Sequence, residues 1–137
     1  MKINSEQEML NFGEKFATII KQNSSKIVEL IGDVGTGKTT FTRGLAKGLG
    51  IKDNVTSPSF TISKSYAIPN GGNLVHYDFY RLSDPGIMID DLLEQLKIKD
   101  NIIVIEWGGE IKDFLPQNHT IINITYNEDN TREVIIK

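Results

Sequence analysis

A glycine-rich loop constrains this chain most, because a few residues fix both its conformation and what it can bind. The stretch GDVGTGKTTFTRG, residues 32–44, lies between a short apolar run and a run with helical character. Gly32, Gly37, Lys38 and Thr39 complete the pattern G-x-x-x-x-G-K-[ST]. Glycines at these positions let successive backbone N–H groups point inward beside a helix N-terminus, and this creates an anion site. The loop is therefore predicted to hold the phosphates of a nucleoside triphosphate.

The polar residues of the loop have separate expected roles. The Lys38 ammonium suits the β- and γ-phosphates, the Thr39 hydroxyl suits Mg²⁺, and Thr40 can donate to the α-phosphate. A glycine-rich turn with an incidental lysine is the competing interpretation, and it is disfavoured because an apolar strand precedes the motif and a helix follows. We expect nucleotide contacts from Asp33, Gly35, Thr36, Gly37, Lys38, Thr39 and Thr40.

Hydrophobic periodicity predicts an α/β domain around this loop. Apolar residues at helical spacing indicate helices, whereas short, fully apolar runs indicate buried strands. The predicted elements are helices at 5–22, 38–49 and 86–97, buried strands at 26–31 and 101–107, and hairpins of 60–67 with 73–80 and of 119–126 with 132–137. Ser5 and Asp84 are the expected helix caps. The sheet should be mixed, with a partly parallel centre and antiparallel additions.

Composition narrows the classes of function. The 137 residues suit a single domain, 1–137, and they carry a net charge of −3 with no cysteine. The negative net charge argues against nonspecific electrostatic binding to nucleic acid or to an anionic membrane. Lack of cysteine removes disulfides and thiolate chemistry and is compatible with the cytoplasm. No apolar run is long enough for a membrane span or a signal peptide, so neither is expected.

Two carboxylates at strand ends are candidates for handling the metal and the attacking water. Glu106 follows four apolar residues in IIVIE, and Asp78 ends LVHYD. A phosphate loop needs such an acid near its metal, and two acids can divide the metal and the water between them. The alternative is a carboxylate that caps a neighbouring helix or pairs with Arg81. Spacing alone leaves these assignments open.

The type of nucleotide-binding protein is restricted by what the sequence lacks. There is no N-K-x-D guanine reader and no D-x-x-G switch, which disfavours a GTPase. Three arginines and the lack of a long insertion argue against a small-molecule kinase. An ATPase that changes its grip on a partner remains the leading interpretation. A small-molecule kinase and a nucleotide-dependent binding module without turnover are the alternatives, and an assay for free phosphate separates them.

Four motifs in this order closely resemble the TsaE (YjeE) family. They are the phosphate loop, VTSPSFTISKSY at 55–66, HYDFYRL at 76–82 and IEW at 105–107. That family comprises bacterial ATPases needed for threonylcarbamoyladenosine (t⁶A) modification of tRNA, and the resemblance covers essentially the whole chain. It implies a three-layer P-loop NTPase fold, ATP with Mg²⁺, and slow intrinsic hydrolysis. It also implies action with TsaD and TsaB, indirect contact with tRNA, and hydrolysis that resets the complex.

The resemblance also implies roles for individual residues. It assigns Thr39 and Glu106 to magnesium, and it places Asp78 with Lys38 and Glu106 in the machinery of hydrolysis. We favour Arg132 of the last hairpin as a further nucleotide contact. The segment TSPSF, an ordinary loop by its composition, becomes a switch-like segment through Thr56 and Ser57. Two departures from the family pattern are Ser59, where threonine is usual, and Gly108, where proline is frequent.

Several other polar or aromatic residues have structural interpretations. His76 is expected to be a structural histidine on the opposite strand face from Tyr77, and His119 is expected to face solvent. The acidic run at 90–94 is expected to be the solvated face of a helix, with partner docking as the alternative. Trp107 is either a stacking residue or a half-buried core residue. Arg81 is expected either to approach the phosphates or to pair with Asp78 when no partner is present.

Overall fold

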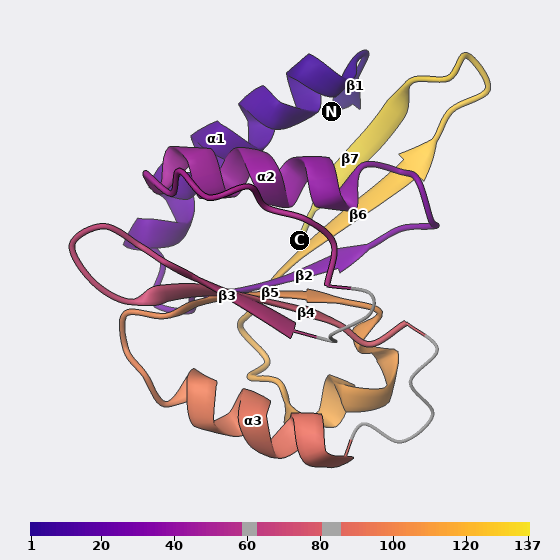
Figure 1. Ribbon diagram of the computed structural model, residues 1–137. Coiled ribbons are helices and arrows are strands. Elements are labelled where there is room, and N and C mark those ends of the chain that lie inside the picture. Colours follow the sequence, from indigo (N-terminus) through magenta and orange to yellow (C-terminus); the bar gives the residue numbers. More distant parts are fainter. Residues whose placement is uncertain (59–62, 81–85) are drawn as a thin grey trace.

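The computed structural model describes residues 1–58, 63–80 and 86–137, and it places a seven-stranded sheet between two layers of helices (Figure 1). The strand order is β1-β7-β6-β2-β5-β4-β3. The strands are β1 (Lys2–Ile3), β2 (Ile27–Ile31), β3 (Ser63–Ala67), β4 (Asn73–Asp78), β5 (Ile102–Glu106), β6 (Thr120–Tyr126) and β7 (Arg132–Ile136). The helices are α1 (Glu6–Gln22), α2 (Lys38–Gly48), α3 (Gly86–Leu96) and the 3₁₀-helix η1 (Gly108–Phe114).

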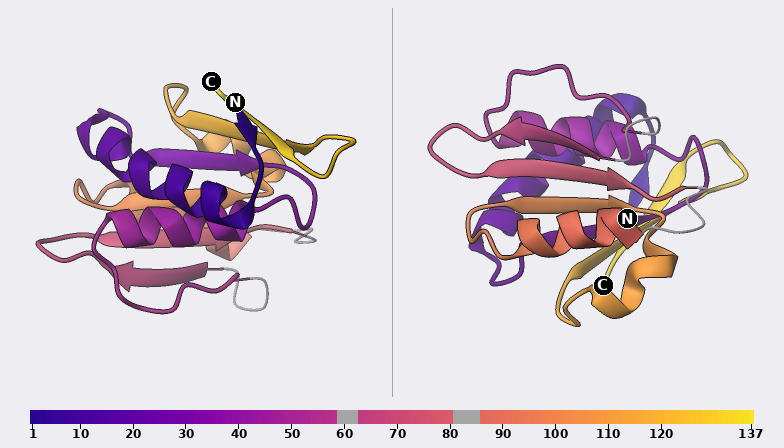
Figure 2. Two further views of the ribbon diagram at one scale, coloured as in Figure 1. Left: turned by 90° about the horizontal axis from the view of Figure 1, so that it is seen from above. Right: turned by 60° about the horizontal axis from the view of Figure 1, so that its bottom comes forward.

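The direction of the strands confirms the expected mixed sheet. Strands β6, β2, β5 and β4 form the parallel centre, whereas β3 at one edge and β7 with β1 at the other are antiparallel additions. The central strands β2 and β5 are short and apolar because both of their faces are covered. Helices α1 and α2 cover one face, and α3 with η1 lies against the other (Figure 2).

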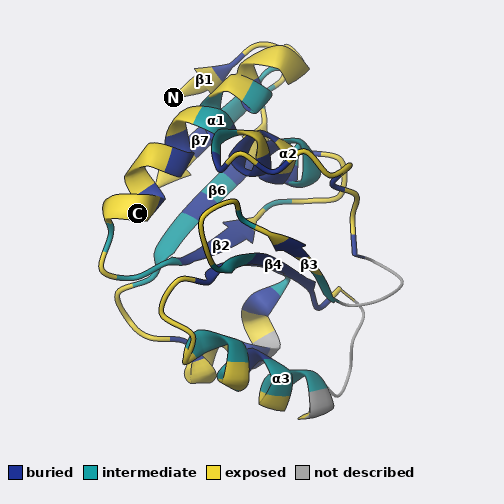
Figure 3. Ribbon diagram, turned by 60° about the vertical axis from the view of Figure 1, so that its left-hand side comes forward, coloured by how far each residue is buried: buried dark blue, intermediate teal, exposed yellow. Residues whose placement is uncertain are grey.

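Two hydrophobic cores lie on the two faces of the sheet. The first packs α1 and α2 on the sheet and includes Phe16 and Phe41, whose ring centroids lie 5.6 Å apart. The second packs α3 and η1 on the sheet and includes Tyr77 and Phe79, whose rings are stacked 5.7 Å apart. Buried residues concentrate along the central strands, while exposed residues line the outer sides of the helices (Figure 3). Side chains along β4 alternate between the two faces of the sheet, so every second residue faces α2 and the residues between them face α3.

Helices α1 and α2 approach each other closely because three glycines lie at their contact. A Cβ atom built on Gly13, Gly44 or Gly48 would lie 2.2–2.4 Å from a backbone oxygen of the facing helix. Backbone oxygens cannot move aside as the end of a flexible side chain can. The close crossing holds α2, and with it the phosphate loop at its N-terminus, against the rest of the domain.

Substituting Gly44 with alanine is expected to destabilise the protein by about 2 kcal/mol, because the new methyl group overlaps the Leu10 carbonyl oxygen at 2.2 Å. This overlap should outweigh the small gain that alanine brings to a helix interior. Gly109→Ala is the matched control, since a Cβ atom there would have no described atom within 4 Å apart from those of its neighbours in the chain. Its effect should stay within about 0.5 kcal/mol. Urea unfolding of the two variants measures the difference. Equal midpoints would contradict the interpretation.

Candidate functional site

The phosphate loop joins the end of β2 to the start of α2. Gly35 and Gly37 have φ angles of 84° and 114°, in the left-handed region where side chains are strained. Thr36 is buried, and its hydroxyl and backbone N–H both donate to the Asp33 carbonyl oxygen, at 2.8 and 3.2 Å. The loop is thus closed by its own hydrogen bonds beside the N-terminus of α2, as the sequence motif predicts.

Lys38 is held by its own loop. Its Nζ donates to the carbonyl oxygens of Gly32 and Asp33, the latter at 3.0 Å, and it lies 4.7 Å from the centroid of the Trp107 ring. Burial lowers the pKa of Lys38, and the carboxylates of Glu106, Asp78 and Asp33 oppose that shift. The ammonium is therefore held by hydrogen bonds to loop carbonyls and by a cation–π contact with the indole ring, and three nearby carboxylates attract it.

Both predicted acids lie beside this lysine. The parallel register of β4 and β5 pairs Asp78 with Glu106, so the two carboxylates leave the same end of neighbouring strands. Both are buried, at 6% and 4% exposure. Asp78 Oδ1 accepts a hydrogen bond of 2.9 Å from the Tyr80 backbone N–H, and Glu106 Oε2 contacts His76 Nε2. The structure therefore brings together all three residues predicted to be catalytic.

These groups surround a cavity of about 320 Å³. Five of the predicted loop contacts line it, namely Gly35, Gly37, Lys38, Thr39 and Thr40. Asp78, Glu106 and Trp107 line the same cavity, together with Ser57 from the predicted switch-like segment. Val34 of the phosphate loop and Tyr80 of the HYDFYRL motif also line it, although the sequence analysis gave neither residue a role. Ser57 is thus placed at the site, which the composition of its segment did not indicate, whereas Thr56 is not among the residues that line the cavity.

Three predicted contacts lie outside this cavity. Arg132 braces the outer side of the loop, because its Nε donates to the Thr36 carbonyl oxygen at 3.2 Å and its Nη2 to that of Gly35 at 3.4 Å. Arg132 and Thr36 line a second cavity of about 280 Å³, which shares Gly35, Gly37 and Thr40 with the first. Asp33 lines a third cavity, of about 560 Å³, which shares Thr36 with the second and Trp107 with the first.

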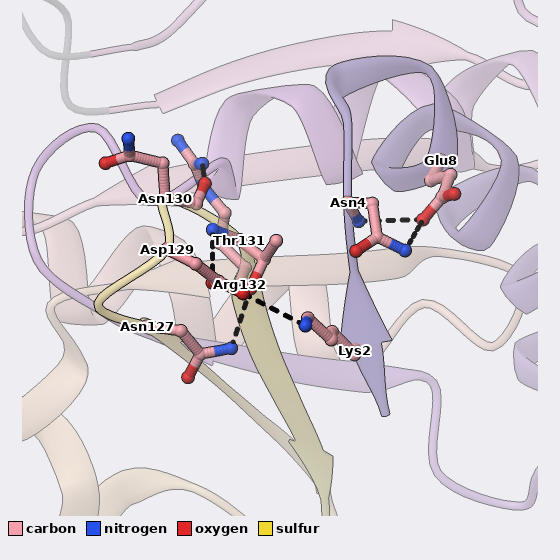
Figure 4. Close-up of polar contacts among 8 residues, drawn as sticks. All are labelled: Lys2, Asn4, Glu8, Asn127, Asp129, Asn130, Thr131 and Arg132. Carbon is pink, nitrogen blue, oxygen red and sulfur yellow. Dashed lines mark hydrogen bonds and ion pairs between the residues drawn. The ribbon is translucent and has the colours of Figure 1, made fainter.

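The hairpin that carries Arg132 is tied to the N-terminal strand (Figure 4). Arg132 Nη1 donates to the Asn130 carbonyl oxygen at 2.7 Å, and its guanidinium lies 4.4 Å from the centroid of the Tyr126 ring. Lys2 Nζ lies 3.0 Å from Asp129 Oδ2 at the turn. Hydrogen bonds from Thr131, with help from Lys2, lower the pKa of Asp129 to about 2. These contacts fix the position from which Arg132 reaches the loop.

Trp107 connects the loop to the sheet. It is the single tryptophan of the chain, and it has a left-handed conformation with φ 57° directly after β5. Its ring lies 4.7 Å from that of Tyr80, and it is half-buried against the second core. It lines the first and the third cavities. The structure confirms the half-buried core interpretation of Trp107. Its ring is tilted by 37° to that of Tyr80, so this contact is not a parallel stack, and the stacking role stays a prediction.

Some predictions about polar residues are corrected by the structure. His119 was expected to face solvent, but its side chain is 9% exposed and its Nε2 lies 3.0 Å from Glu29 Oε1. The acidic run at 90–94 is not wholly solvated, since Asp91 accepts a hydrogen bond of 2.6 Å from the Tyr77 hydroxyl. Burial and this bond raise the pKa of Tyr77 far above its usual value. His76 is buried on the face opposite Tyr77, as expected.

Expectations for Ser59, Arg81 and Asp84 lie outside the described residues. Within the described ranges, none of the helices has the length and apolar character needed to cross a membrane.

Comparison with known proteins gives consistent matches. The family model described as "Threonylcarbamoyl adenosine biosynthesis protein TsaE" matches residues 3–134. A relative from Haemophilus influenzae, named tRNA threonylcarbamoyladenosine biosynthesis protein TsaE, is 41% identical over 135 residues, covering 93% of this chain and 82% of the relative. One of the same name from Rickettsia typhi is 38% identical, covering 98% and 92%. The crystal structure of YdiB from Bacillus subtilis superposes with a TM-score of 0.77 at 31% identity, covering 98% and 80%.

Proposed function

The chain belongs to the TsaE family of t⁶A biosynthesis proteins, and from this premise we propose that it binds and hydrolyses ATP with Mg²⁺. Hydrolysis would reset a cytoplasmic complex with TsaD and TsaB between rounds of tRNA modification, and this chain would not transfer the threonylcarbamoyl group. The tRNA would be reached indirectly through that complex.

One observation carries the proposal: Lys38, Asp78 and Glu106 converge on one cavity at the N-terminus of α2. The backbone N–H groups of a helix N-terminus and the Lys38 ammonium attract phosphate, whereas buried acids would repel it unless a cation lay between them. A magnesium-bound triphosphate supplies both the phosphate anion that the loop attracts and the cation that the acids require. The donor set therefore fits MgATP better than it fits a free anion.

The residues divide the work by their chemistry. Lys38 would exchange the loop carbonyls for the β- and γ-phosphate oxygens, to which an ammonium binds more strongly. Thr39 and Glu106 would hold magnesium, which supplies charge neutralisation for the phosphates. Asp78 would orient or deprotonate the attacking water, since its carboxylate lies beside Glu106 in the register of the sheet. The nucleoside would lie in the second cavity, beside Arg132.

Slow intrinsic turnover has a physical cause in this proposal. The ammonium that should neutralise the transferring phosphate is bound to its own loop and covered by the indole of Trp107. A partner that displaces Trp107 or reorders the segment around Ser57 would therefore raise the rate. Both residues line the cavity from elements outside the loop.

Intrinsic fluorescence should report nucleotide binding, because Trp107 is the single tryptophan and contacts Lys38. Saturating MgATP is expected to change the emission intensity as Lys38 leaves the ring, with a midpoint equal to the Kd from calorimetry. Thr56→Ser should retain the response, since it keeps the hydroxyl that accepts from Lys64 Nζ. Tight binding by calorimetry with unchanged emission would mean that Lys38 stays on Trp107.

A phosphate-release assay with and without TsaB and TsaD tests the proposed function. Slow release from the protein alone and faster release in the complex are expected. Stoichiometric ADP with a phosphorylated small molecule would indicate the kinase instead. Tight ATP binding with no turnover, even in the complex, would indicate a binding module.

A further inference from the structure

A buried histidine lies behind the acid proposed to bind magnesium. His76, in the middle of β4, is 0% exposed, and its Nε2 contacts Oε2 of Glu106 at the end of β5. The register pairs Asp78, two residues after His76, with Glu106. His76 and Asp78 therefore share the strand face that meets α2, and His76 reaches Glu106 from deeper in the sheet.

The imidazole of His76 directs its hydrogen bond to Glu106. An ionised carboxylate only accepts hydrogen bonds, so Nε2–H is the donor in this pair. The other ring nitrogen, Nδ1, is buried and has no hydrogen-bond partner among the residues that the structure describes. A histidine needed only to fill the core would leave two polar atoms to satisfy where leucine leaves none. The contact with Glu106 is thus the one polar contact found for this side chain in the described part of the chain.

We propose that His76 is a positioning residue that fixes the Glu106 carboxylate for magnesium, an inference that rests on the proposed function. Glu106 itself has little freedom to find another donor, because the nearby Lys38 ammonium is bound to carbonyl oxygens of the loop. Holding one carboxylate oxygen restricts rotation of the whole group. Partners of this kind, behind a metal ligand, typically contribute 10- to 100-fold to metal affinity.

Three substitutions separate this role from simple packing. The amide nitrogen of His76→Gln reaches roughly the position of Nε2, whereas that of His76→Asn is one methylene short and lies near Nδ1. His76→Leu fills the space without a donor. The measurement is the factor by which magnesium tightens ATP binding, from calorimetry in Mg²⁺ and in EDTA, with thermal unfolding run in parallel.

His76→Asn and His76→Leu are expected to reduce the tightening by magnesium about tenfold, while ATP affinity in EDTA stays within about twofold. His76→Gln should restore most of the effect. His119→Asn is the matched control, because His119 forms the other histidine–glutamate pair, a partly buried one with Glu29, on the opposite face of the sheet. It should leave the magnesium effect unchanged even where it lowers the unfolding temperature.

The outcomes distinguish this inference from the proposed function. If Glu106→Gln reduces the magnesium effect but His76→Asn does not, the positioning role is wrong and the proposed function stands. If Glu106→Gln has no effect either, both are overturned. Should His76→Leu fail to fold, the comparison of His76→Gln with His76→Asn decides, and equal magnesium effects in these two overturn the inference.

Discussion

Lys38→Ala is expected to weaken ATP binding at least about 100-fold. An ammonium that binds two phosphate oxygens contributes about 1.5–3 kcal/mol for each charged hydrogen bond. Loss of two such bonds, at about 3 kcal/mol or more, corresponds to that factor. Removing the ammonium also leaves Asp78 and Glu106 without the cation beside them, and these acids would repel the triphosphate more strongly. Isothermal titration calorimetry with ATP, in Mg²⁺ and in EDTA, measures the loss.

Lys47→Ala is the control for Lys38→Ala. Lys47 lies in the last turn of the same helix, at the end away from the phosphate loop. Its side chain is 69% exposed, and its Nζ lies 3.7 Å from Glu14 Oε2. Its removal should change ATP affinity less than twofold, because exposed charges are screened by solvent and salt. If the two alanine variants bound ATP equally well, the loop would not be the triphosphate site.

Glu106→Gln is expected to lower magnesium-dependent hydrolysis about 100- to 1,000-fold. The substitution keeps the shape of the side chain but replaces an anionic oxygen with an amide, which is a poor ligand for a hard cation. A metal that stabilises the transferring phosphate contributes several kcal/mol, and misplacing it forfeits much of that amount. ATP affinity in EDTA should not fall, and it should rise to the extent that the lost Glu106 charge had repelled the triphosphate. Single-turnover phosphate release in the presence of TsaB and TsaD gives the rate.

Asp78→Asn tests whether the two acids have separate roles, and Glu94→Gln is the control for both substitutions. Asp78→Asn should lower the rate while leaving the tightening of ATP binding by magnesium intact, because Asp78 is assigned to water. Glu94 is exposed on α3 near Lys97, so Glu94→Gln should leave both quantities unchanged. If Asp78→Asn abolished the magnesium effect and Glu106→Gln did not, the two acids would have exchanged roles.

Most of the fold could be predicted because its elements have strong local signals. Ser5 caps α1 as expected, with its hydroxyl accepting from the Glu8 N–H at 3.1 Å, and both predicted hairpins are present. Strand β1 was missed because its two residues are too short to have a period, and it exists only through its pairing with β7. The 3₁₀-helix η1 was also missed, since its stretch contains two glycines and weak periodicity.

The errors at individual residues share one physical cause. His119 was assigned to solvent because it begins a strand, yet its partner Glu29 is 90 residues away in the sequence. Asp91 was grouped with a solvated acidic run, although it receives the Tyr77 hydroxyl. Buried polar pairs of this kind depend on which elements become neighbours. Their partners do not follow from the spacing of residues along the chain.

The sequence by itself determined the phosphate loop, since the left-handed glycines and the lysine at the start of α2 act within seven residues of one another. Composition and periodicity likewise determined a sheet with a parallel centre. Only the tertiary structure decided that Asp78 stands beside Glu106, that His76 lies behind it, and that Arg132 braces the loop from outside. Local backbone preferences are encoded by adjacent residues, whereas strand register and the burial of charges are set by the packing of the whole domain.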